Sequence, residues 1–379
     1  MSTAVPEPFA EEQNTKEISQ NYWVLVWWRF RQNKLAMFGG FLIIAYYFVC
    51  ALTAEFWSPY LVDTVSDYLE APPQRMQFRH EGRFQARPFV YGLKEEVDMQ
   101  LRKRFFVVDE SVRYPIHLFV RAEEYRLAGL IPSNIHLFGV DPEESPDGYV
   151  YLFGTDRLGR DLFTRIIYGG RLSLLIGLIG QFLTITFGAT LGVISGWYGR
   201  LVDLVVQRVT EFLSAFPDIP LFMALAAAIP PEWSPIAVYF MLTIILACVR
   251  WGGLARQVRG LVLSLREREY VLAAQSFGSN DWRVMFRHLI PGATSHIIVI
   301  STLAIPGMIL AETALSWLGL GLRPPLTSWG VLLYEVSGIR AIQFSPWMLI
   351  TIPVIIGAIW GFNMLGDGLR DALDPYGGQ

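Results

Sequence analysis

Long apolar runs alternate with polar segments along most of the chain. A helix that crosses a bilayer needs about 20 mostly apolar residues, because its backbone groups find hydrogen-bond partners only within the helix. The third run contains Asp218 and two prolines, so we expect its helix to begin irregularly. The pattern predicts an all-α polytopic membrane protein with six transmembrane helices. The six runs are 35–56, 172–198, 212–229, 235–249, 292–310 and 346–365.

The composition supports this class of protein. Of the 379 residues, 53% are hydrophobic and only 17% are charged, whereas a soluble domain carries about 25% charged residues. These values exclude a disordered chain and argue against a cytosolic enzyme. The net charge of −3 gives no overall basic excess that would indicate nucleic acid binding. The two cysteines, Cys50 and Cys248, lie in apolar runs and are predicted to be buried packing residues.

The basic residues predict the orientation, because Lys and Arg concentrate in short cytoplasmic loops. Arg29, Arg31 and Lys34 precede the first run, and seven arginines lie between the fourth and fifth runs, whereas the loop 230–234 has none. Both termini are therefore predicted to be cytoplasmic. The tryptophan-rich stretch 22–30 is interpreted either as a helix lying flat at the membrane surface or as the entrance to the first span.

The segment 57–170 has the composition of a soluble domain, and the orientation places it outside the cell. Four short runs rich in β-branched and aromatic residues predict a compact, mainly β-rich insertion. These runs are 104–108, 116–120, 134–138 and 149–153. A turn-rich stretch separates the last two, so a hairpin is expected there. The insertion is interpreted either as a lid or packing module, or as a docking surface for an extracellular partner.

Motifs for phosphate binding or catalysis are absent from the sequence. None of the four lysines follows a glycine, which excludes a Gly-x-x-x-x-Gly-Lys-Ser/Thr loop for ATP. Neither His-Glu-x-x-His nor Gly-x-Ser-x-Gly occurs, and the histidines of the insertion have no metal-ligand spacing. We therefore predict a non-catalytic chain with no catalytic, cofactor-binding or metal site of its own.

The polar stretch after the fourth run contains a short amphipathic segment. Over 266–278, Tyr270, Ala273, Ala274 and Phe277 recur at helical spacing and form a narrow apolar face on a polar background. Small alanines let another backbone approach closely, and the final glycine suits the left-handed position that ends a helix. This pattern is typical of a helix that docks into a groove on a partner. The alternative is an interfacial helix that rests on lipid headgroups.

At this stretch the sequence resembles the EAA coupling loop of permease subunits in bacterial ABC importers, through Ala273-Ala274, Gly278 and His288-Leu-Ile-Pro291. Leu272 departs from the family pattern, because that position is usually Glu. Family members place this loop in a cleft on the ATP-binding subunit. The resemblance assigns ATPase coupling to residues of the loop 250–291. These residues are Arg266, Glu269, Tyr270, Ala273, Ala274, Phe277, Gly278 and Pro291.

Further segments resemble the dipeptide and oligopeptide permeases of the second-subunit type, similar to those called DppC and OppC. These segments are 154–161, 165–173, 196–203, 312–321 and 366–375. Together with the apolar runs, the resemblance implies the type I ABC importer permease fold in five parts. They are a cytoplasmic tail with an interfacial helix (1–34), a first transmembrane helix (35–56), an extracytoplasmic insertion (57–170), a five-helix core with the coupling loop (171–365) and a cytoplasmic tail (366–379).

The resemblance implies a non-catalytic permease subunit of the bacterial inner membrane that forms half of a pathway for peptides. The implied partners are a homologous permease subunit as a heterodimer, an extracytoplasmic substrate-binding protein, membrane lipid, and two ATP-binding subunits that hold ATP and Mg. Oligosaccharides, opines or a metal chelate are the alternative cargoes. A secondary transporter or a membrane-anchored interaction protein is the alternative class of function.

Ionisable residues at membrane depth are functional candidates, because an unpaired charge is costly there. Asp218 and Glu312 are candidate pathway or gate residues, and a structural role is the alternative for each. Glu312 is expected to pair with Arg323 or with an arginine before the second run. Four residues outside the membrane are predicted to form a stabilising network: Asp156, Arg157, Arg160 and Asp161.

Overall fold

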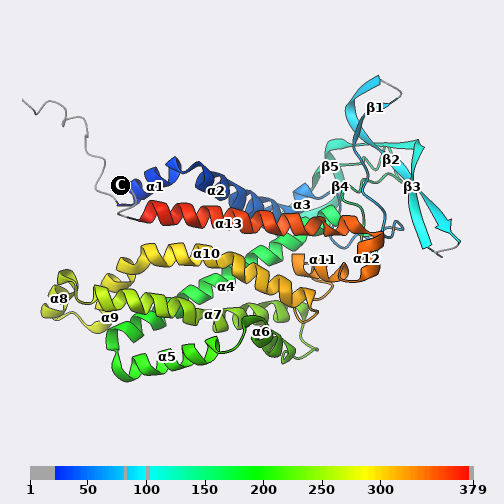
Figure 1. Cartoon of the computed structure of the whole chain (residues 1–379). Helices are drawn as coiled ribbons and strands as arrows, with labels where there is room; N and C mark the ends of the chain where they lie inside the picture. The colour runs from blue at the N-terminus through cyan, green and yellow to red at the C-terminus, as the bar shows by residue number, and fades with distance from the viewer. Residues whose placement is uncertain (1–21, 81–82, 100–102, 375–379) are drawn as a thin grey trace, which may run out of the picture.

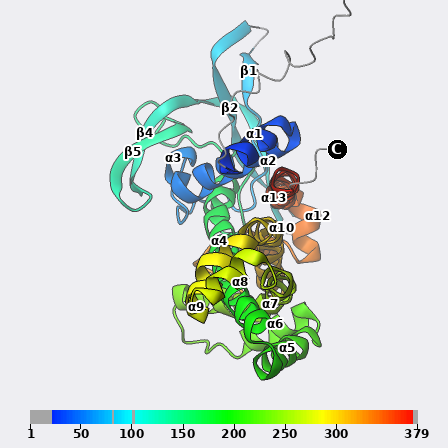
Figure 2. The same cartoon turned by 90° about the vertical axis from the view of Figure 1, so that its left-hand side faces the viewer.

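The computed structural model describes residues 22–80, 83–99 and 103–374. The ends of the two predicted tails, 1–21 and 375–379, lie outside the described residues. The chain forms a bundle of long helices with a β-rich unit at one end, shown in cyan at the right of Figure 1. Seen along the bundle, α1, α2 and α13 lie together on one side and α5 lies on the opposite side (Figure 2).

Among the described residues, five helical segments are long and apolar enough to cross a membrane. Two of them are single helices, α4 (Leu162–Tyr198) and α7 (Pro235–Leu265). Two others join a helix to one further helical stretch: Lys34–Leu52 consists of α2 (Lys34–Tyr46) and η2 (Tyr47–Leu52), and Pro346–Leu373 consists of η4 (Pro346–Ile350) and α13 (Thr351–Leu373). The fifth, Asp281–Trp317, consists of α9 (Asp281–Val284), η3 (Met285–Leu289) and α10 (Ile290–Trp317). The bent pair α5 (Arg200–Ser214) and α6 (Asp218–Ala227) makes a sixth if it is one span. The shorter helices are α1 (Tyr22–Gln32), α3 (Ala54–Trp57), α8 (Glu269–Ser276), α11 (Trp329–Glu335) and α12 (Ile339–Phe344).

The third predicted span is not a single helix. α5 and α6 meet at an angle of 90°, so the apolar run 212–229 covers the end of one helix, the bend and the next helix. Pro217 directly precedes α6, and Pro220 lies in its first turn. A proline lacks the backbone N–H that would continue α5 and disfavours helical geometry in the residue before it, which explains the break.

The predicted start of the core at 171 is wrong, because α4 already begins at Leu162. Asp161 caps the helix: its carboxylate accepts a hydrogen bond from the Thr164 backbone N–H at 2.7 Å. The apolar run begins ten residues later, since the first turns of α4 contain polar residues such as Arg165. The predicted insertion therefore ends before α4, and not at residue 170.

Three other boundaries are also wrong for the same reason. α7 continues to Leu265, so the first part of the predicted loop 250–291 is helical, and the last part belongs to the helical segment that starts at Asp281. α13 continues to Leu373, beyond the predicted end of the core at 365. Each of these helices continues beyond its apolar stretch. The added turns carry polar side chains, because that part of the helix does not have to lie in the lipid.

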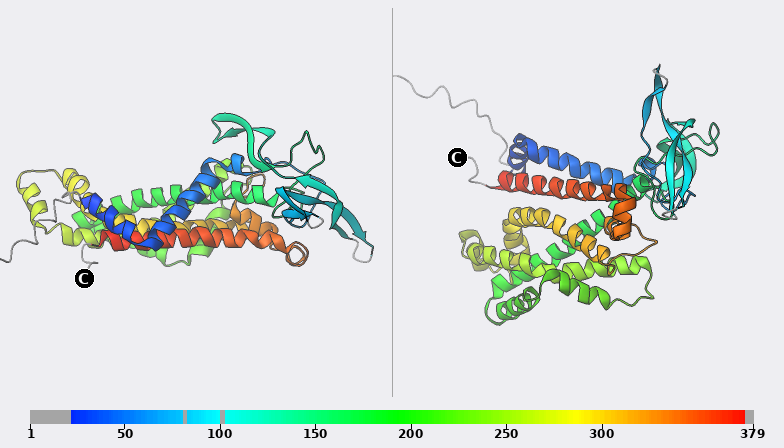
Figure 3. Two further views of the ribbon diagram at one scale, coloured as in Figure 1. Left: turned by 90° about the horizontal axis from the view of Figure 1, so that it is seen from above. Right: turned by 45° about the vertical axis from the view of Figure 1, so that its right-hand side comes forward.

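The β-rich unit consists of two antiparallel sheets. β1 (Gln77–His80), β2 (Arg83–Asp98) and β3 (Lys103–Pro115) form one sheet, and β4 (His117–Leu127) pairs with β5 (Ile131–Gly139) in the other. Figure 3 shows both sheets projecting from the end of the bundle. The predicted hairpin between 134–138 and 149–153 is wrong, because β5 pairs with β4 and 149–153 is not a strand.

A tyrosine cluster attaches the three-stranded sheet to the chain that leads into α4. Tyr149 donates a hydrogen bond to the Leu93 carbonyl at 3.2 Å and accepts one from the Leu93 N–H at 2.6 Å. The centre of its ring lies 4.0 Å from the ring centre of Tyr68 and 5.3 Å from that of Tyr151. Burial raises the pKa of Tyr151 to about 12, so this hydroxyl stays protonated at neutral pH.

Closely packed glycines hold α4 against α7. Gly188, Gly192 and Gly196 recur every four residues and therefore share one side of α4. A Cβ atom built on Gly192 would lie 2.6 Å from the Ala255 carbonyl oxygen, and one on Gly188 would lie 2.9 Å from the Trp251 carbonyl oxygen. Small residues at such spacing let two membrane helices approach at backbone distance.

Only one cysteine is a packing residue. Cys50 is 5% exposed and lies against Gly170 of α4, whereas Cys248 on α7 is exposed. The prediction is therefore wrong for Cys248. An apolar run identifies a candidate span but does not reveal which side of its helix packs inward.

Candidate functional site

The segment between α7 and α9 forms a helix and a turn at the end of the bundle opposite the β-rich unit (Figure 1). α8 ends at Ser276 and is followed by Phe277 and Gly278, whose φ of 78° lies in the left-handed region that favours glycine. The Gly278 N–H donates to the Gln275 carbonyl at 2.9 Å, and the Ser279 N–H donates to the Ala274 carbonyl at 3.0 Å. These bonds satisfy carbonyls at the end of α8 and reverse the chain towards α9.

α8 packs on this chain through Val271, a residue outside the predicted apolar face. Val271 is fully buried, and Ala274 is half-buried in the same cluster, which contains Met285 and Leu289. Phe277 is 90% exposed. Of the four residues of the predicted apolar face, Ala274 therefore faces this chain. The other three, Tyr270, Ala273 and Phe277, are exposed.

Polar contacts fix the base of this segment to α4. Arg266 donates from Nη1 to the Gly196 carbonyl at 3.3 Å. Two turns earlier, on α7, Arg259 donates two hydrogen bonds to Asp203 of α5, each 2.5 Å long. Asp203 also accepts a hydrogen bond from Ser195 of α4 at 2.7 Å. The predicted coupling residues Glu269 and Pro291 lie at the start of α8 and of α10, respectively.

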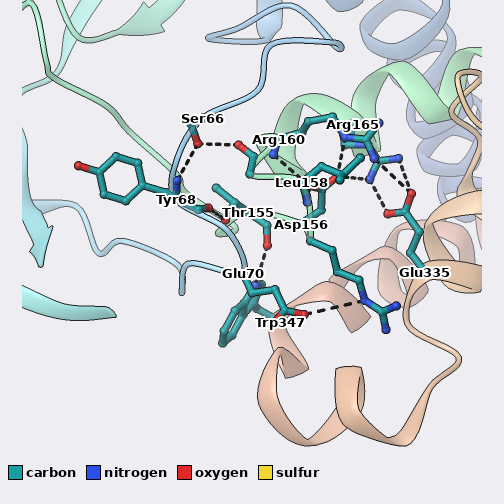
Figure 4. Close-up of polar contacts among 12 residues, drawn as sticks. Ser66, Tyr68, Glu70, Thr155, Asp156, Leu158, Arg160, Arg165, Glu335 and Trp347 are labelled. Carbon is teal, nitrogen blue, oxygen red and sulfur yellow. Dashed lines mark hydrogen bonds and ion pairs between the residues drawn. The ribbon is translucent and has the colours of Figure 1, made fainter. Parts of the chain in front are cut away.

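A buried ionic cluster lies at the opposite end of the bundle (Figure 4). Asp156 accepts from Arg160 Nε at 2.7 Å and from Arg165 Nη1 at 2.5 Å. Arg165 also donates to both carboxylate oxygens of Glu335, at 2.5 and 2.9 Å, and Arg160 reaches Glu335 at 3.3 Å. Two arginines thus balance two carboxylates, and the Arg165 side chain is only 1% exposed.

The cluster contains two of the four residues predicted for it, Asp156 and Arg160. Arg157 points elsewhere and lies 3.9 Å from Glu70, with half of its side chain exposed. Asp161 caps α4 instead, and burial raises the pKa of its carboxyl to about 7.

The sequence interpretation missed Arg165 and Glu335 as cluster members. Their side chains meet across 170 residues of sequence, joining α4 to α11. An arginine in the first turn of an apolar helix was the available signal, because such a charge needs a buried partner.

Removing Arg165 is expected to destabilise the fold strongly. Arg165→Met would leave Asp156 and Glu335 sharing Arg160 alone, and breaking a buried pair in this way costs about 3–5 kcal/mol. The thermal unfolding midpoint of the purified protein should fall clearly. Arg157→Met is the matched control, because its exposed ion pair is worth about 0–1 kcal/mol. Equal midpoints for the two variants would contradict this assignment.

Glu312 lies inside α10 and is 1% exposed. It accepts hydrogen bonds from the hydroxyls of Ser173 at 3.1 Å, Ser316 at 2.8 Å and Ser328 at 2.8 Å. The predicted pairing with Arg323 is wrong, since Arg323 donates to the Gly319 carbonyl at 3.3 Å. Three serine hydroxyls thus donate to the Glu312 carboxyl in place of an arginine. These hydrogen bonds connect α4, α10 and the start of α11.

Asp218 is the first residue of α6, directly after the bend. Its side chain is 60% exposed and lies 3.6 Å from Nη2 of Arg250 on α7. Asp218 and Glu312 are thus separate, each with partners of its own.

The sequence matches two family profiles. Residues 188–376 match the binding-protein-dependent transport system inner membrane component, and residues 21–73 match the N-terminal TM domain of oligopeptide transport permease C. The two matches leave out residues 74–187, which include all five strands and most of α4.

Individual relatives show the same similarity. The chain is 42% identical over 224 residues to the dipeptide transport system permease protein DppC of Alkalihalophilus pseudofirmus, covering 59% of this chain and 71% of that protein. It is 40% identical over 230 residues to the oligopeptide transport system permease protein OppC of Haemophilus influenzae, covering 60% and 71%. The OppC protein of Bacillus subtilis is 38% identical over 244 residues, covering 64% and 76%.

Proposed function

Since this chain belongs to the family of binding-protein-dependent dipeptide and oligopeptide transport permeases, we propose that it forms half of a pathway through which an ABC importer moves peptides. The chain is a multi-pass permease subunit of the inner membrane. We place both termini in the cytoplasm, because the arginine-rich connection after the fourth apolar run then faces inward.

The proposed partners supply the chemistry that this chain lacks. A homologous permease subunit completes the pathway as a heterodimer, and an extracytoplasmic binding protein delivers the peptide. Two ATP-binding subunits hold ATP and Mg and hydrolyse the nucleotide. The permease itself is non-catalytic and converts their motion into a change of access.

One observation carries the proposed coupling: α8 presents Ala273 and Phe277 outward while Val271 anchors the opposite side of the helix in the bundle. An exposed aromatic beside a small residue suits docking into a cleft on the ATP-binding subunit. Movement of α8 would reach α10 through the shared cluster around Val271. It would reach α4 through the hydrogen bond from Arg266 to the Gly196 carbonyl.

At the outer end, we propose that the buried ionic cluster keeps α11 fixed to the start of α4. Gly159, with a φ of 76°, forms the turn between Asp156 and Arg160. Ser66 donates to the Gly159 carbonyl at 2.7 Å, so the cluster also holds the chain that leads to the β-rich unit (Figure 4). In this account the four residues are structural and do not contact cargo.

Reconstitution tests the proposed function. The complete transporter, with its second permease, ATP-binding subunits and binding protein, is placed in proteoliposomes with the binding-protein side outside. We expect ATP inside the vesicles to drive uptake of a labelled dipeptide, with no uptake when ATP is replaced by ADP. Uptake without ATP would indicate a secondary transporter. Uptake of an oligosaccharide or metal chelate but of no peptide would overturn the proposed cargo.

A further inference from the structure

A cavity of about 340 Å³ with several polar side chains in its wall opens between helices of the bundle. Its wall includes residues of α4, α6, α7 and α10 within stretches that are otherwise apolar. Such residues usually mark the path of a substrate through a membrane protein. The polar side chains that matter here are Gln181, Asp218, Arg250, Arg256 and Gln257.

Arg250 occupies the wall of this cavity with hydrogen-bonding capacity to spare. Its Nη2 is 3.6 Å from Asp218, a loose single contact, and its guanidinium carbon is 5.7 Å from the centre of the Phe222 ring. Its Nε is buried and finds no acceptor in the described part of the chain. A guanidinium carries five N–H donors in a planar fork that matches a carboxylate.

Gly307 of α10 leaves space for this guanidinium. A Cβ atom at Gly307 would overlap Nη1 of Arg250, so the arginine lies directly against the α10 backbone. Arg250 is therefore held between α7 and α10 with its charge at the cavity, and its side chain is 27% exposed.

The remaining groups give the cavity a positive excess and an unused acceptor. Arg250 and Arg256 line the cavity together with one carboxylate, Asp218, so the wall holds one more positive than negative charge. Arg256 donates to the Ser214 hydroxyl at 3.1 Å. Gln181 is 3% exposed, and its Oε1 has no hydrogen-bond donor among the residues that the structure describes. Buried polar groups are normally paired, so both Gln181 and Arg250 are suited to bind a passing polar ligand.

The cavity adjoins a second one that leads to the end of the bundle where α8 lies. This second cavity, about 490 Å³, shares Gln257 and Ile300 with the first. It is lined further by His296 near the start of α10 and by Arg370 near the end of α13. The two cavities therefore lie next to each other between the middle of α7 and the proposed cytoplasmic side.

We propose that Arg250 is a transit site for the carboxylate terminus of the peptide, an inference that rests on the proposed function as a peptide permease. Every unmodified linear peptide has this group, whatever its side chains are, so one arginine serves all sequences. The carboxylate of the peptide replaces Asp218 as the partner of Arg250. Gln181 Oε1 is then an acceptor for an N–H group of the peptide. The weak resting contact keeps the arginine available and the site transient.

The test compares uptake with ATP hydrolysis in proteoliposomes of the complete transporter at saturating loaded binding protein. Arg250→Gln is expected to lower dipeptide uptake at least tenfold, while hydrolysis stimulated by the binding protein changes less than twofold. Arg250→Lys should retain a larger share of uptake, because it keeps the charge. Asp218→Asn should stay within threefold of the wild type, since it removes only the competing carboxylate.

A second measurement reports binding directly and needs no binding protein. A dipeptide with a diazirine side chain is photolysed with the purified complex, and adducts are mapped by mass spectrometry. We expect labelling of α6, α7 or α10 around the cavity, at least fivefold weaker in Arg250→Gln and for the C-terminal amide of the same dipeptide.

Three results would overturn the proposal. The first is wild-type uptake by Arg250→Gln, and the second is equal loss in Arg250→Gln and Asp218→Asn, as a purely structural ion pair predicts. The third is labelling that does not distinguish carboxylate from amide. A wild-type complex that imports no peptide would instead contradict the proposed function, so the two failures are distinguishable.

Discussion

Replacing Ala273 with Arg is expected to reduce peptide uptake to below a tenth of the wild-type rate in a protein that still inserts and folds. Ala273 is exposed on α8 and lies one turn before Phe277, which is 90% exposed. A long charged side chain there would hold α8 away from the cleft that we propose it occupies. Loss of one packed interface anchor costs about 2 kcal/mol or more, enough to break coupling. Uptake into proteoliposomes and co-purification of the ATP-binding subunits measure the effect.

The matched control is Gln275→Arg on the same helix. With about 100° between successive residues, Gln275 lies on the opposite side of α8 from Ala273 and Phe277, and it is also exposed. It should retain most of the uptake. Ala274 is not used, because it is half-buried in this chain's own cluster and an arginine there would disturb the fold. If Ala273→Arg and Gln275→Arg transport equally well, α8 is not the coupling surface.

Gly192→Ala is expected to lower the stability of the folded protein by crowding the contact between α4 and α7. The new Cβ would lie 2.6 Å from the Ala255 carbonyl oxygen and 2.9 Å from Val258 Cβ, so α4 and α7 would have to separate. Overpacking of this kind costs about 1–3 kcal/mol. The change should lower the thermal unfolding midpoint in detergent and reduce the amount of protein in the membrane.

Gly260→Ala provides the control on α7. A Cβ atom at Gly260 finds no heavy atom of the described residues within 4 Å. Alanine favours a helix over glycine by about 1 kcal/mol, so this variant should be as stable as the wild type or slightly more stable. If Gly192→Ala also leaves the midpoint unchanged, the close approach of α4 and α7 does not depend on the glycine.

The membrane helices could be predicted from apolar length, but their ends could not. α4 starts ten residues before its apolar run because Asp161 caps it and because Arg165 is neutralised by acidic partners. α7 starts at the predicted residue but runs 16 residues beyond the predicted end, as an arginine-bearing extension to Leu265. The length of an apolar run reflects the thickness of the bilayer that the helix crosses. The ends of the helix are set by the residues that cap its backbone, which can lie outside the apolar run.

Features formed by residues that are close in sequence could be predicted, whereas contacts between distant residues could not. The position of α8 and its glycine end followed from local pattern, but the inward face did not, because Val271 is buried by residues of α9 and α10. Asp156 and Arg160 are four residues apart and were found together. Glu335 was missed, since only the folded chain brings α11 to α4. The Glu312 carboxyl accepts hydrogen bonds from serines, and the residues next to it in sequence do not indicate whether its partners are serines or an arginine.

The most direct test of the account is a photo-cross-link from position 277. Phe277 is replaced by a photoreactive benzoyl-phenylalanine in the assembled transporter, which is irradiated with and without ATP. We expect an adduct with an ATP-binding subunit whose yield changes with the nucleotide. Adducts with lipid alone in a transporter that still imports peptide, or labelling of position 277 by a reagent confined to the outside, would contradict a cytoplasmic coupling helix.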